Sequence, residues 1–430
     1  MPTESRVGIS ALSRPVDPGR LRVFFLCPFI LRAWELHMTH AALSARMDGL
    51  RSSAIRDLLT LTARPDVISM AGGLPDADFI PRERISKAAH DALGDPSSVQ
   101  YGETSGLRRL REVIAERESS KIGRALDVSE VVITHGSQQG LSLLAQVLLD
   151  AGDVVVVEEP AYTGALQVFR TAQARLVPVQ LDEDGMDTAA LEAKLDAGLR
   201  PKVVHTVSNF HNPRGAVLSA QRRTHLAALA DRYGFWVLED DPYGELYFGE
   251  QPPAPLAALS DRVIRLSSAS KVLAPALRVG WLHGHRKVCE AVELIKQGAD
   301  LCGSSLTQQI TADLFSDLEW FETHLDMLRE GYGARAKALV AAAEAELGGL
   351  ARFSEVRGGM FCWMDFLGDV DTTELLGVAL EHGVAFVPGT AFAVEADLRR
   401  SARLCFATYP EAVLIDAVGR LRDSVTSGTA

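Results

Sequence analysis

The sequence predicts an α/β protein with a large domain, whose mostly parallel seven-stranded sheet is covered by helices, and a smaller α+β domain built from both chain ends. Short apolar runs alternate with helical patterns between residues 84 and 330. The runs are continuous in Val, Ile and Leu, as in parallel strands buried on both faces. A long amphipathic stretch near residues 320–347 then leads into a region with different patterning. Because ~150 residues is a usual domain length, 430 residues fit two domains.

The large domain is predicted over residues 84–330. The first apolar run leads into a helix from Ser137, and helical patterns separate the later runs. The seven strands are predicted at residues 131–134, 153–157, 175–179, 203–207, 235–238, 263–266 and 280–283.

The small domain is predicted from residues 47–83 and 331–430. Its strands are expected at residues 361–366, 385–388 and 403–406. Residues 1–46 form an extension that we expect to be poorly ordered or packed on a partner. Its apolar run at 23–31 is too short, and too broken by Pro28, to span a bilayer.

Composition excludes several classes of protein. There are 44 Lys and Arg residues against 56 Asp and Glu, giving a net charge of −12. Nucleic-acid binding requires a positive surface, so no nucleic-acid partner is expected. The five cysteines are scattered and contain no C-x-x-C pair, as expected for reduced thiols in a cytoplasmic protein. Neither a membrane partner nor a metal site is predicted.

Lys271 is the most informative residue of the chain. It follows a predicted buried strand, at the end where ligands collect in open parallel sheets. Its amine can form a Schiff base with an aldehyde cofactor, while Ser268, Ser270 and Arg278 bind a phosphate on that cofactor. Alone, the same pattern also fits an exposed lysine in a Ser-rich loop.

A second phosphate-binding element follows the first strand. Gly136 permits close approach of a phosphate, and Ser137 is expected to cap the helix, with Gln138 beside it. Strand-Gly-Ser-helix turns are common, so this pattern is weak by itself.

The ring nitrogen of a pyridoxal needs a carboxylate that keeps it protonated, because the pyridinium is the stronger electron sink. Asp240 ends a predicted strand, and Tyr243 follows three residues later, where it can contact the ring's phenolic oxygen. Asp241 is the rival for the carboxylate, and the acidic pair could also merely cap a turn.

Three further residues complete the predicted site. Asn212 lies in an N-P-x-G turn after a buried strand and can donate to the phenolic oxygen. Tyr162 follows another strand and can cover the ring face. Arg403, which is expected to open a strand of the smaller domain, can hold a substrate carboxylate with two parallel hydrogen bonds.

The order of these motifs resembles that of fold-type I pyridoxal-phosphate-dependent aminotransferases of class I/II, over residues 48–425. The branch with 2-aminoadipate, aromatic and branched-chain transaminases is most similar. The motifs that carry the resemblance are 72–75, 101–102, 136–139, 209–215, 240–243, 268–278 and 403–404.

The resemblance implies pyridoxal 5'-phosphate as cofactor, bound covalently by Lys271. It implies amino acid and 2-oxo acid substrates, with Arg403 on the α-carboxylate and Gly73 and Asn212 beside the substrate. It also implies a homodimer with shared active sites, in which Tyr101 reaches the phosphate in the neighbouring subunit. The remaining cofactor contacts implied are Ser137, Gln138, Tyr162, Asn212, Asp240, Tyr243, Ser268, Ser270 and Arg278.

The sequence departs from that branch at Ser208, His211 and Arg214, which flank Asn212 and affect the expected substrate preference. Arg56 is a candidate for binding a substrate side-chain carboxylate, which would make glutamate and 2-oxoglutarate one substrate pair; a surface arginine paired with Asp57 fits equally well. Two alternatives stay open: a decarboxylase, β-lyase or synthase on the same fold, and an aminotransferase-like transcription regulator.

Overall fold

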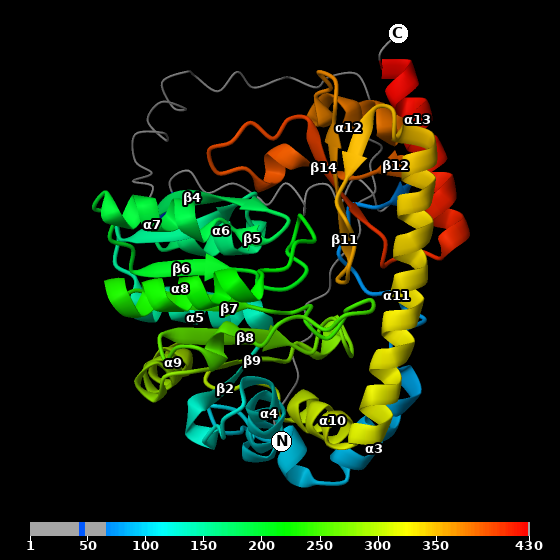
Figure 1. Ribbon diagram of the computed structural model, residues 1–430. Helices are drawn as coiled ribbons and strands as arrows, with labels where there is room; N and C mark the ends of the chain where they lie inside the picture. Colours follow the sequence, from blue (N-terminus) through cyan, green and yellow to red (C-terminus); the bar gives the residue numbers. More distant parts are fainter. Residues whose placement is uncertain (1–42, 48–65, 429–430) are drawn as a thin grey trace, which may run out of the picture. The chain divides into compact units, whose positions relative to one another are not determined.

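The computed structural model describes residues 43–47 and 66–428 (Figure 1). The chain divides into two compact units, Met1–Met47 and Asp48–Ala430. The described part of the first unit is a short 3-10 helix, η1 (Ala45–Met47). Most of the predicted extension lies outside the described residues, as does Arg56. The strands and α-helices of the described residues all belong to the second unit.

The main sheet of this unit has the strand order β2-β9-β8-β7-β6-β3-β4-β5. β9 runs antiparallel to both of its neighbours and β5 runs antiparallel to β4, while the other neighbouring pairs are parallel. The seven predicted strands are all present. The eighth, β5, has two residues, too few to leave an apolar run. The strands are β2 (Val131–Thr134), β3 (Val154–Glu159), β4 (Arg175–Asp182), β5 (Gly185–Met186), β6 (Val203–Thr206), β7 (Trp236–Asp240), β8 (Val263–Ser268) and β9 (Gly280–His283).

Helices cover both faces of the sheet. Val155 and Val157 of β3 pack with residues of α5, α6 and α9, whereas Val156 between them packs with α7 and α8 on the other face. Alternate residues therefore enter different cores, which explains the continuous apolar runs. The helices from α3 to α10 are α3 (Arg82–Leu93), α4 (Arg108–Ile122), α5 (Gly136–Leu148), α6 (Thr163–Thr171), α7 (Thr188–Asp196), α8 (Ala220–Tyr233), α9 (Arg286–Ala299) and α10 (Ser305–Ser316). The 3-10 helices are η2 (Pro96–Val99), η3 (Val128–Glu130), η4 (Leu256–Ala258), η5 (Pro275–Leu277) and η6 (Gly389–Phe392).

A second, antiparallel sheet has the order β10-β11-β14-β13. A separate parallel pair joins β1 to β12, so residue 68 lies beside residue 384. Helices α11 and α13 run beside each other next to these strands (Figure 1). The elements are β1 (Ile68–Ser69), α11 (Leu318–Leu347), β10 (Ala351–Phe353), β11 (Phe361–Phe366), α12 (Thr372–Glu381), β12 (Val384–Ala385), β13 (Val387–Pro388), β14 (Ser401–Cys405) and α13 (Glu411–Gly428).

The predicted domain border and the predicted start of the last strand both fall inside observed elements. The border between the predicted domains, at residues 330 and 331, falls inside the continuous helix α11. Arg403 is the third residue of β14 and not its first, so the expectation that it opens the strand is wrong. The strand begins earlier because Ser401 and Ala402 already pair with β11.

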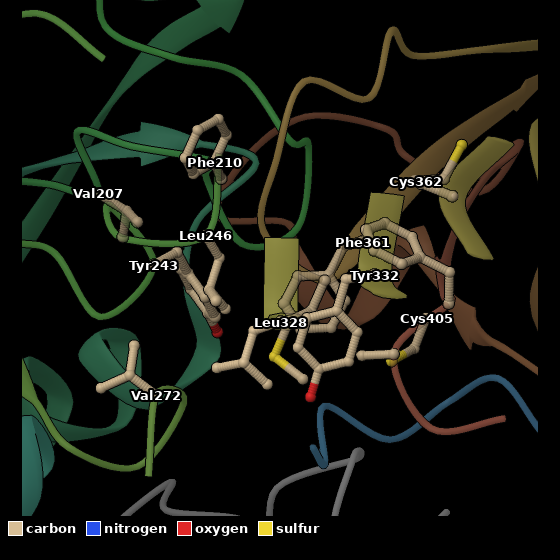
Figure 2. Close-up of a cluster of buried hydrophobic side chains, with 14 of the residues drawn as sticks. Val207, Phe210, Tyr243, Leu246, Val272, Leu328, Tyr332, Phe361, Cys362 and Cys405 are labelled. Atoms are coloured by element: carbon tan, nitrogen blue, oxygen red, sulfur yellow. The ribbon is translucent and has the colours of Figure 1, made fainter. Parts of the chain in front are cut away.

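One hydrophobic cluster joins the two sheets (Figure 2). Tyr243, which follows β7, meets Phe361 of β11 edge to face with ring centroids 5.9 Å apart. Leu328 and Tyr332 of α11 belong to the same buried cluster. The shared core holds the second sheet against the carboxyl ends of the main strands. No helix within the described ranges is long and apolar enough to cross a membrane.

Candidate active site

A cavity of about 470 Å³ lies where the parallel strands of the main sheet end. β2, β3, β6, β7 and β8 all point their carboxyl ends toward it, the usual position of a ligand site in an open α/β sheet. Phe361 and Arg403 of the second sheet also line it. The predicted site residues that line this cavity are Gly73, Ser137, Gln138, Tyr162, Asn212, Asp240, Tyr243, Ser268, Ser270, Lys271, Arg278 and Arg403.

Lys271 follows β8 and its side chain is enclosed by protein while opening onto the cavity. Its Nζ donates a 2.7 Å hydrogen bond to the carbonyl oxygen of Gly73. Burial, together with the positive charges of Arg403 and Arg278, lowers the pKa of Lys271 to about 8 against an opposite effect of Cys405. Roughly a tenth of such amines are neutral at pH 7, so Lys271 can act as a nucleophile or base.

The first turn of α5 and Arg278 form one end of the cavity. Arg278 has φ +53° and donates a 2.8 Å hydrogen bond from Nη2 to the carbonyl oxygen of His135. A Cβ on Gly136, whose φ is +73°, would lie 2.8 Å from that same Nη2. Only glycine therefore lets the guanidinium approach the helix start this closely. The result is a cationic end with unpaired helix N–H groups, suited to an anion.

The expectation that Ser137 caps α5 is wrong. The helix begins at Gly136, its N-cap is His135, and no side chain caps it. Instead the backbone N–H of His135 donates to Oε1 of Gln139. Because Ser137 lies inside the first turn, its hydroxyl and N–H face the cavity end that it lines.

The Gln138 carboxamide is occupied by neighbouring protein groups. Its Nε2 donates to the carbonyl oxygen of Gly164 at 3.0 Å, and its Oε1 accepts from the Tyr162 hydroxyl at 3.1 Å. The side chain thus holds Tyr162 in place, while its backbone N–H in the first turn remains for an anion. Burial raises the pKa of Tyr162, so its phenol stays protonated.

The structure separates the two candidate carboxylates. Asp240 lines the cavity, and its Oδ1 has no hydrogen-bond partner among the described residues. Its Oδ2 lies 3.6 Å from Nε2 of His205. Asp241 points into the protein, where it accepts hydrogen bonds from Arg265, Asn209 and the Gly244 N–H. Asp240 is therefore the carboxylate available to a ligand.

Arg403 is 2% exposed and faces the cavity from β14. Its Nη1 donates to Oδ1 of Asn212 at 2.7 Å, and its Nη2 to the carbonyl oxygen of Ala71 at 2.7 Å. Its Nε has no partner among the described residues. The guanidinium carbon lies 4.2 Å from the centroid of the Phe361 ring. Burial lowers the pKa of Arg403 to about 10, so it remains a cation at neutral pH.

Among the described residues, one predicted site residue is not brought to this cavity. Tyr101 is 79% exposed and lines a separate hollow formed by residues 98–101 and 302–306. Arg56 lies outside the described residues. Among the residues that line the cavity, the sequence reasoning missed Phe361, Val207 and several of α6, including Thr163 and Gln167. The only signal for Phe361 was its place in an apolar strand pattern.

Comparisons with known proteins all indicate the same family. The model of the family "Aminotransferase class I and II" matches residues 65–421. An aromatic-amino-acid aminotransferase of Thermococcus litoralis is 35% identical over 88% of this chain and 92% of its own. A 2-aminoadipate transaminase of Thermus thermophilus is 37% identical over 86% of this chain and 93% of its own.

A solved structure extends the likeness to three dimensions. Kynurenine aminotransferase of Pyrococcus horikoshii, in complex with PMP, has a TM-score of 0.86 and 34% identity over 92% of this chain and all of its own. The chain therefore belongs to the class I and II aminotransferase family and has the fold-type I architecture. It is a transaminase.

Proposed function

We propose that the chain binds pyridoxal 5'-phosphate in the cavity and moves an amino group between an L-amino acid and a 2-oxo acid. The observation that carries this proposal is the lining of one cavity. It brings together Lys271 with its lowered pKa, one oxygen of the buried Asp240 carboxylate without a partner among the described residues, and the likewise unpartnered Nε–H of Arg403. When bound, this cofactor supplies an aldehyde that condenses with amines and a ring that accepts an electron pair.

The lining residues fit each part of the cofactor. The first turn of α5, with Arg278, Ser268 and Ser270, would hold the phosphate. The unpaired Oδ1 of Asp240 would accept a hydrogen bond from the protonated ring nitrogen. Tyr162 would cover the ring face.

The ring's phenolic oxygen would meet two donors. Because Oδ1 of Asn212 is occupied by Arg403, its Nδ2 is the group left to donate. Burial raises the pKa of Tyr243, so its hydroxyl also remains a donor.

Arg403 and Lys271 would then have separate roles in the transfer of the amino group. Arg403 would bind the α-carboxylate of the substrate, which would satisfy the free Nε–H. Lys271, once displaced by the substrate amine, would take the proton from the α-carbon and return it on the cofactor side. Hydrolysis by water would then release a 2-oxo acid while its amino group stays on the cofactor, and a second 2-oxo acid would take up that group by the reverse sequence, so the kinetics should be ping-pong.

The second substrate pair is proposed to be glutamate and 2-oxoglutarate. Lys271, Arg278 and Arg403 are the basic residues that line the cavity among the described residues, and all three already have roles. A side-chain carboxylate would therefore need a further cation, for which Arg56 is our candidate. An unchanged KM for 2-oxoglutarate in Arg56→Ala would remove that assignment.

We also propose a homodimer in the cytoplasm, with no nucleic acid or membrane partner. Tyr101 is exposed in the single chain, and it would reach the phosphate in the other subunit. The described cysteines, Cys289, Cys302, Cys362 and Cys405, form no disulfide, which agrees with a reducing compartment.

An absorbance titration tests the proposed function. The purified protein, supplied with the cofactor, should show a visible band that borohydride reduction fixes on Lys271. Addition of an amino acid alone should convert the band to that of the pyridoxamine form. Steady release of CO₂ without this conversion would favour a decarboxylase instead. Transamination by Lys271→Ala at near the wild-type rate would refute the assignment.

A further inference from the structure

Glu159, the last residue of β3, holds a loop that comes from the other end of the chain. Its side chain is buried, with 1% of the residue exposed. Its Oε1 accepts the Val394 N–H at 2.8 Å, and its Oε2 accepts the N–H groups of Glu395 at 2.8 Å and Ala396 at 3.3 Å. One carboxylate thus binds three successive backbone donors.

The negative charge of Glu159 is costly to bury, and no other group could easily replace its carboxylate as acceptor for the three N–H groups. Within the described ranges, no Lys, Arg or His side chain comes within ion-pair distance of Glu159, so backbone N–H groups carry the stabilisation of its charge. Successive N–H groups that converge in this way form an anion-binding concavity. Without the carboxylate, the three donors would be left without their present acceptor.

A fourth hydrogen bond ties the same two segments together. The N–H of Ala161 donates to the carbonyl oxygen of Phe392 at 2.9 Å. We call the contact between residues 159–161 and residues 392–396 the clasp. Three of its hydrogen bonds join the Glu159 side chain to the backbone of residues 394–396, and the fourth joins the two backbones, so together they fix the spacing of the segments.

One side of the clasp continues directly into the active-site cavity, and the other contacts a residue that lines it. Tyr162, which lines the cavity, follows Ala161 in the chain. On the other side, the ring of Phe392 lies 5.1 Å from the guanidinium carbon of Arg403 and packs edge to face on Trp363. The clasp therefore lies between the residue proposed to cover the cofactor and the residue proposed to bind the substrate carboxylate.

We propose that Glu159 is a positioning residue, which sets the distance between Tyr162 and Arg403 and thereby the affinity for amino and 2-oxo acids. This inference rests on the proposed function, because it assigns the substrate carboxylate to Arg403. Glu159 is not among the residues that line the cavity proposed to bind cofactor and substrate. Its effect should thus appear in KM for both substrates and leave cofactor binding unchanged.

The test compares three variants of the holoenzyme. Glu159→Ala removes the acceptor. Glu159→Gln keeps its size but turns an NH₂ toward backbone donors. Glu395→Ala is the matched control, because it removes an exposed carboxylate from the same loop while its backbone N–H remains. We expect KM for donor and acceptor to rise about tenfold in both Glu159 variants, with kcat within about threefold and the visible cofactor band unchanged.

The outcomes separate this inference from the proposed function. If the Glu159 variants have wild-type KM values and only a lower Tm, the residue is merely structural and the inference fails. If they lose the cofactor band, Glu159 supports cofactor binding and the inference is equally wrong. If Glu159→Ala does not fold, Glu159→Gln decides on the same KM measurement. If the wild-type protein itself shows no transamination, the proposed function fails, and the inference fails with it.

Discussion

Arg403 and Asn212, 191 residues apart in the chain, are joined by a 2.7 Å hydrogen bond from the guanidinium to the amide oxygen. The bond settles the orientation of the amide, because its oxygen is occupied and its nitrogen remains for a ligand. It also connects the proposed binding of the substrate to the proposed binding of the cofactor. The residue proposed to bind the α-carboxylate holds the residue proposed to contact the ring oxygen.

Replacing Arg403 with Lys should separate binding from chemistry. An ammonium cannot donate two parallel hydrogen bonds to a carboxylate while also holding Asn212 and Ala71. We expect KM for amino acid and 2-oxo acid to rise roughly tenfold to a hundredfold, with the visible cofactor band retained. Steady-state kinetics with both substrates measure this. Arg400→Lys, at an exposed position of the same segment, should leave both KM values unchanged.

Asp240→Asn should impair catalysis more than cofactor binding. The amide cannot stabilise a positively charged ring nitrogen as a carboxylate does, although it has nearly the same shape. We expect kcat to fall by roughly a hundredfold or more. Single-turnover conversion by an amino acid, followed by absorbance, gives the rate. The control is Asp261→Asn, which changes an exposed carboxylate before β8. A kcat within twofold of wild type would show that Asp240 is not the ring partner.

The main sheet could be predicted from the sequence because each of its buried strands forms a continuous run of apolar residues. Val155, Val156 and Val157 enter cores on both faces, and this requires an uninterrupted apolar run. The strands β1 and β5 have only two residues each, too few to form such an apolar run. β1 also pairs with a strand far along the chain, Ile68 with Val384, whereas β5 folds back on its neighbour β4.

The site could be predicted only in part for the same reason. Asp240 ends β7 and Lys271 comes shortly after the end of β8, so their position at the same sheet edge follows from topology. The choice between Asp240 and Asp241 depended on which side the backbone turns, and Arg265 decides it by occupying Asp241. The clasp at Glu159 required knowledge of a contact that spans 235 residues.

The lowered pKa of Lys271 gives a pH dependence for cofactor capture by the cofactor-free protein. Only the neutral amine attacks an aldehyde, and with a pKa of about 8 the neutral fraction rises from about a tenth at pH 7 to about nine-tenths at pH 9. The rate of capture should therefore rise about tenfold over this interval and level off above it. A lysine of ordinary pKa would continue to gain about a hundredfold. Stopped-flow absorbance measures the rate, with Nα-acetyl-lysine as the reference amine.

Arg265 should matter for stability although it does not line the cavity. It is buried with three carboxylates, and its nitrogens lie 3.1 Å from Glu118, 3.2 Å from Glu239 and 2.6 Å from Asp241. Arg265→Met removes the only ion pair of Asp241 among the described residues, whereas Glu118 keeps Lys121 and Glu239 keeps Arg223. Because a buried charge then lacks its partner, the free energy of unfolding should fall by about 3–5 kcal/mol.

Urea denaturation at a fixed protein concentration measures this loss. Arg286→Ala removes an exposed pair with Glu290 in α9 and should cost less than about 1 kcal/mol. A loss of equal size in the two variants would contradict the assignment of Arg265 to a stabilising buried network.

Subunit mixing tests whether Tyr101 acts across a dimer interface. Lys271→Ala should abolish activity, and Tyr101→Ala should weaken it by removing a phosphate contact made by the other subunit. In a mixed dimer, one of the two sites combines the intact Lys271 of one subunit with the intact Tyr101 of the other. Equal amounts of the variants, unfolded and refolded together, should then recover roughly a quarter of wild-type activity, because about half of the dimers are mixed and each has one intact site. Refolding each variant alone gives the control. If mixing yields no more than the average of the separate activities, Tyr101 does not complete its neighbour's site. Its exposure in the single chain would then need another explanation.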